Sequence, residues 1–225
     1  GRVEADGRGA CTRNAGGPIV VAGIDIAARV FKRYDRDVDV RVLVRDGDRV
    51  AKGAKLMNVS GPARSLLTAE RTSLNVLQRM CGIATLTATY VEAIRGTRAR
   101  LIDTRKTTPG LRMIEKHAVA CGGGLNHRLG LDSGVMIKDN HIAVCGGIGK
   151  AVERARRKLP VLTKLEVECD RLEQVREALD AGVDVIMLDN MSVPAMANRA
   201  STCSCRSPGI MWACASKAVP SAACW

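Results

Sequence analysis

Four times between residues 101 and 200, a short aliphatic strand is followed by a charged tip and a helical segment. The strands with their tips read LIDTRK (101–106), GVMIKDNH (134–141), KLEVECD (164–170) and DVIMLDN (184–190). Such alternation is typical of a parallel sheet with crossover helices, either a barrel or a doubly wound sheet. A doubly wound sheet usually has a glycine-rich first turn, whereas the GGG at 122–124 precedes a strand. The pattern therefore favours a barrel.

The charged residues stand at the carboxyl end of each predicted strand. They are Arg105 and Lys106, Lys138, Glu168 and Asp170, and Asp189. The carboxyl ends of barrel strands form one face, where active sites are built. Since burying adjacent like charges is costly, Arg105 and Lys106 either face water or meet an anionic partner. Alternatively, the cations and carboxylates pair with one another as salt bridges at the rim.

The overall charge also favours an anionic partner. The formal net charge is +12 and the pI is about 9.6. Nucleic acid, an anionic membrane surface and a small anion with carboxylates or phosphates all fit this charge. Base stacking on a protein normally uses aromatic or Arg side chains, and aromatic residues make up only 2% of the sequence. We expect a small anion, and neither nucleic acid nor membrane as a partner.

The cysteines indicate a reducing compartment. Their number, nine, is odd, and no C-x-x-C motif occurs. Free thiols are therefore favoured over a disulfide framework, and with no signal-peptide pattern we expect a cytoplasmic protein. A zinc site in the C-terminal segment would use Cys203, Cys205, Cys214 and Cys224. The C-x-C spacing is poor and no His is nearby, so we expect no zinc there.

The chain is predicted to have three parts. Residues 1–66 form a β-rich domain with an irregular segment at 1–17, because short β-like runs and turn signals fill residues 18–62. A long helix from Thr68 to Gly96 opens the partial β/α barrel of residues 67–198. Within this helix, Gly82 marks either a break or a close contact.

The third part, residues 199–225, departs from these patterns. It contains no Asp or Glu, both Trp and four of the nine Cys, with neither helical nor strand periodicity. We expect it to be disordered and to leave an open sheet edge after residue 190. A truncated or frameshifted copy would end in this way, and the initial Gly suggests that the native start is missing.

Seven motifs occur in order along the chain. They are ERTSLN (70–75), GIAT (82–85), DTRKTTPGLR (103–112), EKHAV with GGG and NHR (115–128), IKDNH (137–141), LEVE (165–168) and MLDN (187–190). Together they resemble the quinolinate phosphoribosyltransferase family, the carboxylating nicotinate-nucleotide pyrophosphorylases of NAD biosynthesis. The resemblance covers about residues 18–198. It implies an α/β fold, with a β-rich, open-faced N-terminal sandwich followed by an incomplete parallel β/α barrel whose C-terminal strands are missing or divergent.

The resemblance also implies a reaction. Phosphoribose passes from 5-phosphoribosyl-1-pyrophosphate to the ring nitrogen of quinolinate, and loss of carbon dioxide gives nicotinate mononucleotide. The substrate-binding residues it implies are Arg71, Thr104, Arg105, Lys106, His127, Arg128, Lys138, Glu168 and Asp189. Of these, Glu168, Asp189 and Lys106 are implied to be catalytic. Glu168 and Asp189 are also implied to hold the cofactor Mg²⁺, through phosphate or water if not directly.

In the family, the residue matching Arg71 reaches the neighbouring subunit's site, so the resemblance implies a homodimer or larger homo-oligomer. Two alternatives remain open. A paralogue of the same fold would act on another anionic substrate, and a decayed, non-catalytic basic protein would keep the motifs without the activity.

Overall fold

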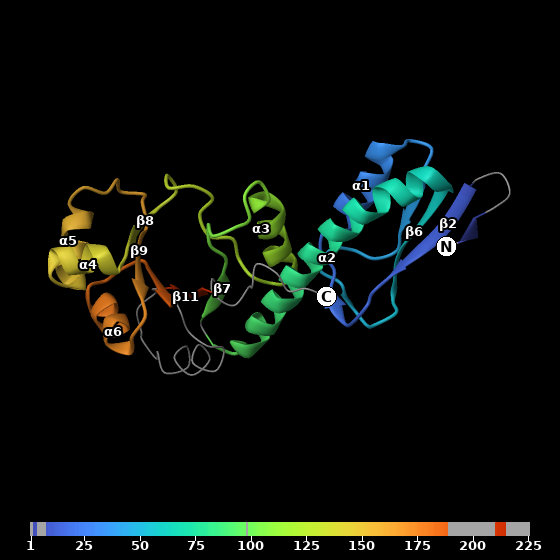
Figure 1. Ribbon diagram of the computed structural model, residues 1–225. Helices are drawn as coiled ribbons and strands as arrows, with labels where there is room; N and C mark the ends of the chain where they lie inside the picture. Colours follow the sequence, from blue (N-terminus) through green and yellow to red (C-terminus); the bar gives the residue numbers. More distant parts are fainter. Residues whose placement is uncertain (1, 4–7, 98, 189–209, 215–225) are drawn as a thin grey trace. The chain divides into compact units, whose positions relative to one another are not determined.

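The computed structural model describes residues 2–3, 8–97, 99–188 and 210–214 (Figure 1). The chain divides into two compact units. The first comprises Gly1–Ala88 and Pro109–Gly123, and the second comprises Thr89–Thr108 and Gly124–Trp225. The division falls inside helix α2 (Ala63–Ala93), not between residues 66 and 67. Leu66, Leu77 and Cys81 of α2 belong to the hydrophobic core of the first unit, which explains the difference.

The first unit is rich in β-strands, as the sequence predicted. Its antiparallel sheet has the order β1-β2-β6-β4, and β3 pairs with β5 in a second, two-stranded sheet. The strands are β1 (Arg2–Val3), β2 (Arg8–Asn14), β3 (Ile19–Val20), β4 (Asp39–Val42), β5 (Arg49–Val50) and β6 (Lys55–Pro62). Helices α1 (Ile24–Tyr34), α3 (Arg112–Cys121) and most of α2 complete the unit.

The prediction that residues 1–17 are irregular is wrong for residues 8–14. This segment is strand β2, which pairs antiparallel with β6 from Arg8 opposite Pro62 to Asn14 opposite Lys55. Polar and small side chains hid the strand in the sequence, since ladder hydrogen bonds come from the backbone. Helix α1 was also missed, although it buries Phe31, the only phenylalanine of the sequence.

The long helix begins earlier than predicted. It starts at Ala63, directly after β6, and the hydroxyl of Thr68 donates to the carbonyl of Arg64 inside the helix instead of capping its start. Gly82 neither breaks the helix nor marks a close contact, because a Cβ built there meets nothing within 4 Å.

The second unit contains a five-stranded sheet of parallel strands in the order β7-β11-β10-β9-β8. The strands are β7 (Arg100–Ile102), β8 (Val135–Ile137), β9 (Leu165–Cys169), β10 (Val185–Leu188) and β11 (Ile210–Cys214). Between them in the chain come α4 (Asp139–Cys145), α5 (Ile148–Arg156) and α6 (Leu172–Asp180). The predicted α/β class, with a β-rich N-terminal part and parallel strands after it, is confirmed.

Strand β11 corrects two expectations about the C-terminal segment. Residues 210–214 are not disordered, and they pair in parallel with both β10 and β7. The sheet edge expected to stay open beside β10 is therefore covered by backbone hydrogen bonds. The rest of the predicted tail, residues 199–209 and 215–225, lies outside the described residues.

The core of the second unit explains why β10 is apolar throughout and why alternate residues of β9 are apolar. Leu165, Val167 and Leu188 are fully buried and join Ile148 and Val175 of the flanking helices in one hydrophobic cluster. Strands of a parallel sheet covered by crossover helices are buried on their faces and so contain long runs of aliphatic residues.

We predict that Gly122→Ala destabilises the first unit. A Cβ at Gly122 would lie 2.4 Å from the carbonyl oxygen of Ala84 and 2.6 Å from Cβ of Thr87. Such overpacking costs on the order of 1–3 kcal/mol in the free energy of unfolding. Urea denaturation followed by circular dichroism measures this change.

Gly82→Ala is the control, because the added methyl group has open space in α2, the helix against which Gly122 packs. It should stabilise the protein by about 0.5–1 kcal/mol through helix propensity. Equal stability changes in the two variants would contradict the close packing at Gly122.

Candidate functional site

The parallel register brings charged side chains to one edge of the sheet in the second unit. Ile137 of β8 lies opposite Val167 of β9, and Leu188 of β10 lies opposite Cys169. Lys138 directly follows β8, and Glu168 stands near the end of β9. The expectation that charged strand ends meet at one edge is confirmed for β8 and β9, whereas the charged end of β10, Asp189, lies outside the described residues.

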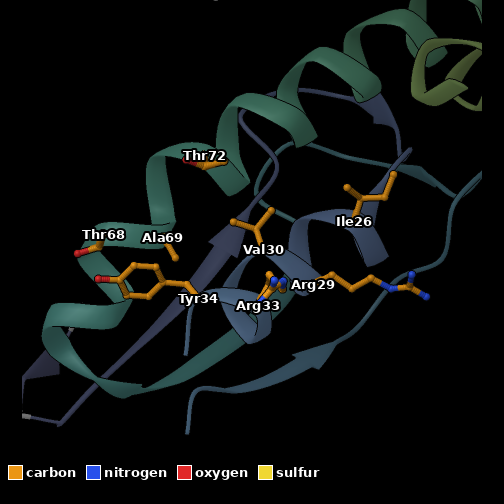
Figure 2. A pocket seen from close by; sticks show the side chains of 8 residues that line it. All are labelled: Ile26, Arg29, Val30, Arg33, Tyr34, Thr68, Ala69 and Thr72. Carbon is orange, nitrogen blue, oxygen red and sulfur yellow. The ribbon is translucent and has the colours of Figure 1, made fainter. Parts of the chain in front are cut away.

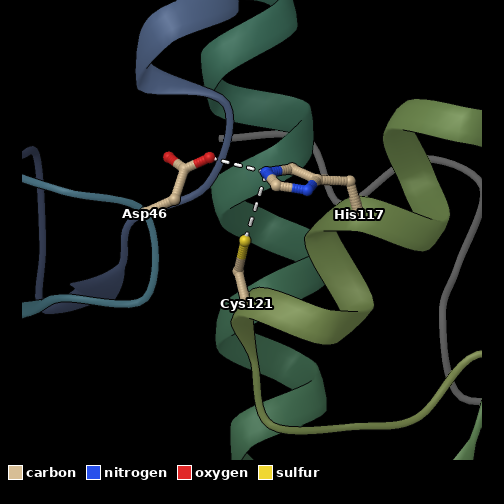
Figure 3. Close-up of side chains that lie close together, drawn as sticks. All are labelled: Asp46, His117 and Cys121. Carbon is tan, nitrogen blue, oxygen red and sulfur yellow. Dashed lines mark hydrogen bonds and ion pairs between the residues drawn. The ribbon is translucent and has the colours of Figure 1, made fainter.

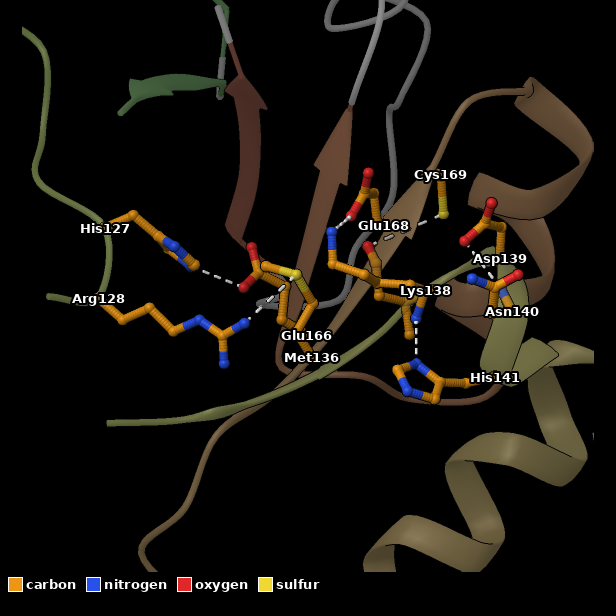
Figure 4. A network of polar contacts seen from close by, with 11 residues as sticks. His127, Arg128, Met136, Lys138, Asp139, Asn140, His141, Glu166, Glu168 and Cys169 are labelled. Atoms are coloured by element: carbon orange, nitrogen blue, oxygen red, sulfur yellow. Dashed lines mark hydrogen bonds and ion pairs between the residues drawn. The ribbon is translucent and has the colours of Figure 1, made fainter. Parts of the chain in front are cut away.

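Lys138 is positioned by the start of α4. Its backbone is extended, and its carbonyl accepts a hydrogen bond from the N–H of Ile142, which makes Lys138 the N-cap residue. Its own N–H donates to Nδ1 of His141 at 3.0 Å (Figure 4). In the motif IKDNH, the histidine therefore closes the first turn of the helix and fixes the backbone from which the Lys138 side chain extends.

Lys138 and Glu168 form an ion pair. Nζ of Lys138 lies 2.6 Å from Oε2 of Glu168, as Figure 4 shows. The side chains are 43% and 20% exposed, so solvent reaches the ammonium group more than the carboxylate. An ammonium group has three N–H donors, and one bond to Glu168 leaves capacity for an anion at the same edge.

A second and more deeply buried pair lies on the same face of β9. Nε2 of His127 lies 2.7 Å from Oε2 of Glu166, and the side chains are 17% and 8% exposed. Oε1 of Glu166 is buried and has no hydrogen-bond partner among the residues that the structure describes. Sequence reasoning missed Glu166. The alternation of side chains along a strand could have identified it, because residues two apart, such as Glu166 and Glu168, lie on the same face.

The loop before β8 is hydrogen-bonded to β7, and this contact explains the position of His127. Leu125 forms a parallel bridge with Ile102, and its N–H donates to the carbonyl of Leu101 at 2.8 Å. The N–H of His127 then donates to Oδ1 of Asp103 at 2.7 Å. Asp103, which the sequence reading did not assign to the site, thus holds the backbone of His127.

Arg128 contacts the segment that leads into β8. Nη1 donates to the carbonyl of Gly134 at 2.9 Å, and Nη2 lies 3.8 Å from the sulfur of Met136 (Figure 4). These contacts close the loop of residues 128–134. They hold the guanidinium group beside the strand that ends at Lys138.

After β7, the chain turns at the segment that contains Arg105 and Lys106. The hydroxyl of Thr104 accepts a hydrogen bond from the N–H of Lys106 at 3.1 Å. The side chain of Lys106 is exposed, and that of Arg105 is half-buried. Both belong to the second unit, with His127, Arg128, Lys138 and Glu168.

The remaining predicted residues belong to the first unit or lie outside the described residues. Arg71 belongs to the first unit, where its side chain is exposed on α2. Asp189 lies outside the described residues, as do Cys203, Cys205 and Cys224.

Cys169 stands at the end of β9 and is not a nucleophile. Burial, and then the negative charges of Asp170, Glu177 and Glu168, raise the pKa of its thiol to about 12. At neutral pH the group is a protonated thiol, which is a poor nucleophile.

A surface groove in the first unit contains none of the predicted site residues. Figure 2 shows it between α1 and α2. It is lined by Ile26, Arg29, Val30, Arg33, Tyr34, Thr68, Ala69 and Thr72. Its lining offers two guanidinium groups but no carboxylate.

Basic groups after two parallel strands and carboxylates on a third define an α/β protein with a charged edge at the carboxyl ends of its strands. Comparison with known proteins specifies the family. The model for the quinolinate phosphoribosyl transferase C-terminal domain matches residues 83–216, and the model for the N-terminal domain of the same family matches residues 3–81. The chain belongs to the quinolinate phosphoribosyl transferase family, as its motifs indicated.

Its relatives carry consistent names. A probable nicotinate-nucleotide pyrophosphorylase (carboxylating) of Synechocystis is 48% identical over 79% of this chain and 60% of its own length. The nicotinate-nucleotide pyrophosphorylase (carboxylating) of Mycobacterium leprae is 48% identical over 78% and 62%. The crystal structure of NadC from Streptococcus pyogenes is 38% identical with a TM-score of 0.77, over 95% of this chain and 83% of that one. The chain thus spans about three-fifths of the length of these curated relatives.

We predict that Glu166→Ala destabilises the protein because it leaves His127 without its carboxylate. A buried hydrogen bond to a charged group contributes on the order of 1.5–3 kcal/mol to the free energy of unfolding. Urea denaturation measures this loss.

Glu153→Ala serves as the control, since it removes a carboxylate that pairs with Arg157 where both side chains are more than half exposed. Surface pairs of this kind contribute about 0–1 kcal/mol. If both variants lose the same stability, burial does not strengthen the pair of Glu166 and His127.

Proposed function

We propose that this chain carries out decarboxylating phosphoribosyl transfer to quinolinate in NAD biosynthesis. The observation that supports this most directly is the edge of the parallel sheet where Lys138, His127 and Arg128 lie beside the carboxylates of β9. The relatives named for this activity add independent support.

Both substrates are anions, which accounts for the chemistry of this edge. Quinolinate has two carboxylates, and the sugar donor has a phosphate and a pyrophosphate. The planar guanidinium groups of Arg105 and Arg128 suit bidentate contacts with carboxylate or phosphate. Lys138 acts as a point charge that bridges Glu168 and a substrate carboxylate, because its three donors serve both at once. The exposed Lys106 meets the phosphates, as does the hydroxyl of Thr104.

The carboxylates have a separate task. Departure of pyrophosphate develops positive charge on the ribose ring, and fixed carboxylates stabilise this charge as it forms. Glu168 and Asp189 take this role and also bind ribose hydroxyl groups. Loss of carbon dioxide then leaves electron density on the ring carbon beside the cationic nitrogen, and nearby cations stabilise this density.

Magnesium fits the donor groups of this edge. Mg²⁺ prefers oxygen ligands and is usually held by one or two carboxylates together with substrate phosphates and water. Glu168 supplies such a carboxylate at the end of β9, and we propose Glu168 and Asp189 as its protein ligands. When bound, the ion would neutralise charge on the pyrophosphate group.

We further propose a cytoplasmic homodimer. Arg71 is exposed in the first unit, which suits a side chain that completes the anion site of a neighbouring copy. No helix among the described residues combines the length and apolar character needed to cross a membrane.

A direct assay tests the activity. The purified chain is incubated with Mg²⁺, 5-phosphoribosyl-1-pyrophosphate and either quinolinate or nicotinate, and nicotinate mononucleotide is measured by chromatography. We expect product with quinolinate only. Product from nicotinate, or from neither acid, would contradict the proposal and favour a paralogue or a non-catalytic protein.

We predict that Arg105→Ala and Lys138→Ala each weaken quinolinate binding. Loss of a charged hydrogen bond in such a site costs on the order of 2–4 kcal/mol, or about 30- to 900-fold in Kd. Calorimetric titration with quinolinate measures the affinity. Lys150→Ala, which removes an exposed cation from α5, should leave Kd unchanged. Parent affinity in both site variants would refute their assignment.

We predict that Asp189→Asn lowers kcat more than it raises KM for quinolinate. The carboxylate meets charge that exists only in the transition state, so its loss should appear mainly in turnover. Steady-state kinetics separate the two effects. A raised KM with parent kcat would indicate a role in binding alone.

A further inference from the structure

Three side chains that bind metals well converge in the first unit, outside the site described above. Asp46, His117 and Cys121 place one ligand atom each within 4.8 Å of one another (Figure 3). Oδ2 of Asp46 lies 2.7 Å from Nε2 of His117, and Sγ of Cys121 lies 3.5 Å from the same nitrogen. Asp46 is 71 residues from His117 in sequence, so tertiary packing brings them together.

The geometry argues against a cysteine nucleophile with a histidine base. In such a triad, the cysteine and the carboxylate contact opposite nitrogens of the imidazole ring. Here both contact Nε2, as Figure 3 shows. A proton on Nε2 serves only one of its two neighbours, whereas a metal ion among the three atoms binds all of them.

Asp46 is held with one oxygen directed at the cluster. Its Oδ1 accepts a hydrogen bond from the N–H of Ile24, the first residue of α1, at 3.0 Å. The turn around Asp46 is stabilised by a hydrogen bond from the N–H of Gly47 to the carbonyl of Val21 at 2.8 Å. Oδ2 therefore stays oriented toward His117 at little entropic cost.

The other two ligands share one face of α3. His117 and Cys121 are four residues apart, which places their side chains one above the other on a helix. Two contacts fix this helix on α2. The guanidinium group of Arg79 pairs with Glu115 at 2.5 Å, and the backbone at Gly122 packs against Ala84 and Thr87.

We propose that Asp46, His117 and Cys121 form a binding site for a divalent transition-metal ion of the zinc class. Carboxylate oxygen, imidazole nitrogen and thiolate sulfur are the three ligand types of zinc in proteins. Tetrahedral bonds of zinc to these atoms put ligand atoms about 3.2–3.8 Å apart, so small side-chain rotations open the present contacts to that geometry. Water takes the fourth position, and His117, which is 50% exposed, gives an ion access from solvent.

The thiol is protonated when the ion is absent. Burial, and then the charge of Asp46, raise the pKa of Cys121 to about 11. Binding therefore forms the sulfur–metal bond as the S–H proton leaves to solvent. The bound ion would link the turn at Asp46 to α3 and stabilise the first unit by mass action.

Cobalt(II) is the probe, because a cobalt–thiolate bond gives a charge-transfer absorption band that oxygen and nitrogen ligands do not. The full chain is reduced, freed of metal with a chelator and titrated with Co²⁺. We expect a band that saturates at one equivalent of Co²⁺ and that Zn²⁺ abolishes. The band should be absent in Cys121→Ser and retained in Cys145→Ser, which changes another half-buried cysteine.

Two further variants keep the test decisive. Asp46→Asn retains the oxygen that accepts from Ile24 but loses the anionic ligand, and it should weaken Co²⁺ binding at least about tenfold. Replacing Cys203, Cys205, Cys214 and Cys224 together by Ser removes the C-terminal thiols and should leave the band intact. No band in the parent, a band that persists in Cys121→Ser, or parent affinity in Asp46→Asn would overturn the proposal, as would loss of the band with the C-terminal thiols.

Discussion

Parallel pairing of β8, β9 and β10 is the constraint on which the charged edge of the second unit depends. Backbone hydrogen bonds set Ile137 against Val167, and this register puts Lys138 level with Glu168. Helices on the sheet bury the aliphatic side chains of the strands, and this burial favours charged groups near the strand ends. Glu166, which is 6% exposed within β9, is an exception, and its carboxylate is paired with His127.

The ion pairs at this edge leave one carboxylate oxygen unsatisfied among the described residues. Lys138 pairs with Glu168, as the expectation of rim salt bridges allowed, and His127 pairs with Glu166, a contact that was not expected. Yet Oε1 of Glu166 is buried without a hydrogen-bond partner among the described residues. Leaving a carboxylate oxygen unsatisfied costs stability, and natural proteins tolerate such costs mainly at functional sites.

Sequence patterns predicted the elements whose side chains follow a clear period. The aliphatic strands and amphipathic helices of residues 101–188 were found because burial on one side imposes that period. Strand β2 was missed because its polar side chains leave the pairing to the backbone. Strand β11 was missed because it lies in a segment without helical or strand periodicity, and its place in the sheet comes from backbone pairing with β10 and β7.

The sequence by itself determined the family, the fold class and the kinds of charge at the strand ends, since motifs and periodicity are local properties. Only the tertiary structure decided which charges pair. It joined His127 to Glu166, a residue that the motif reading had left out, because the loop at Leu125 lies along β7. It also brought Asp46 to His117 and Cys121. That contact depends on how α3 packs on α2. The spacing of neighbouring residues in the sequence does not predict how distant segments pack.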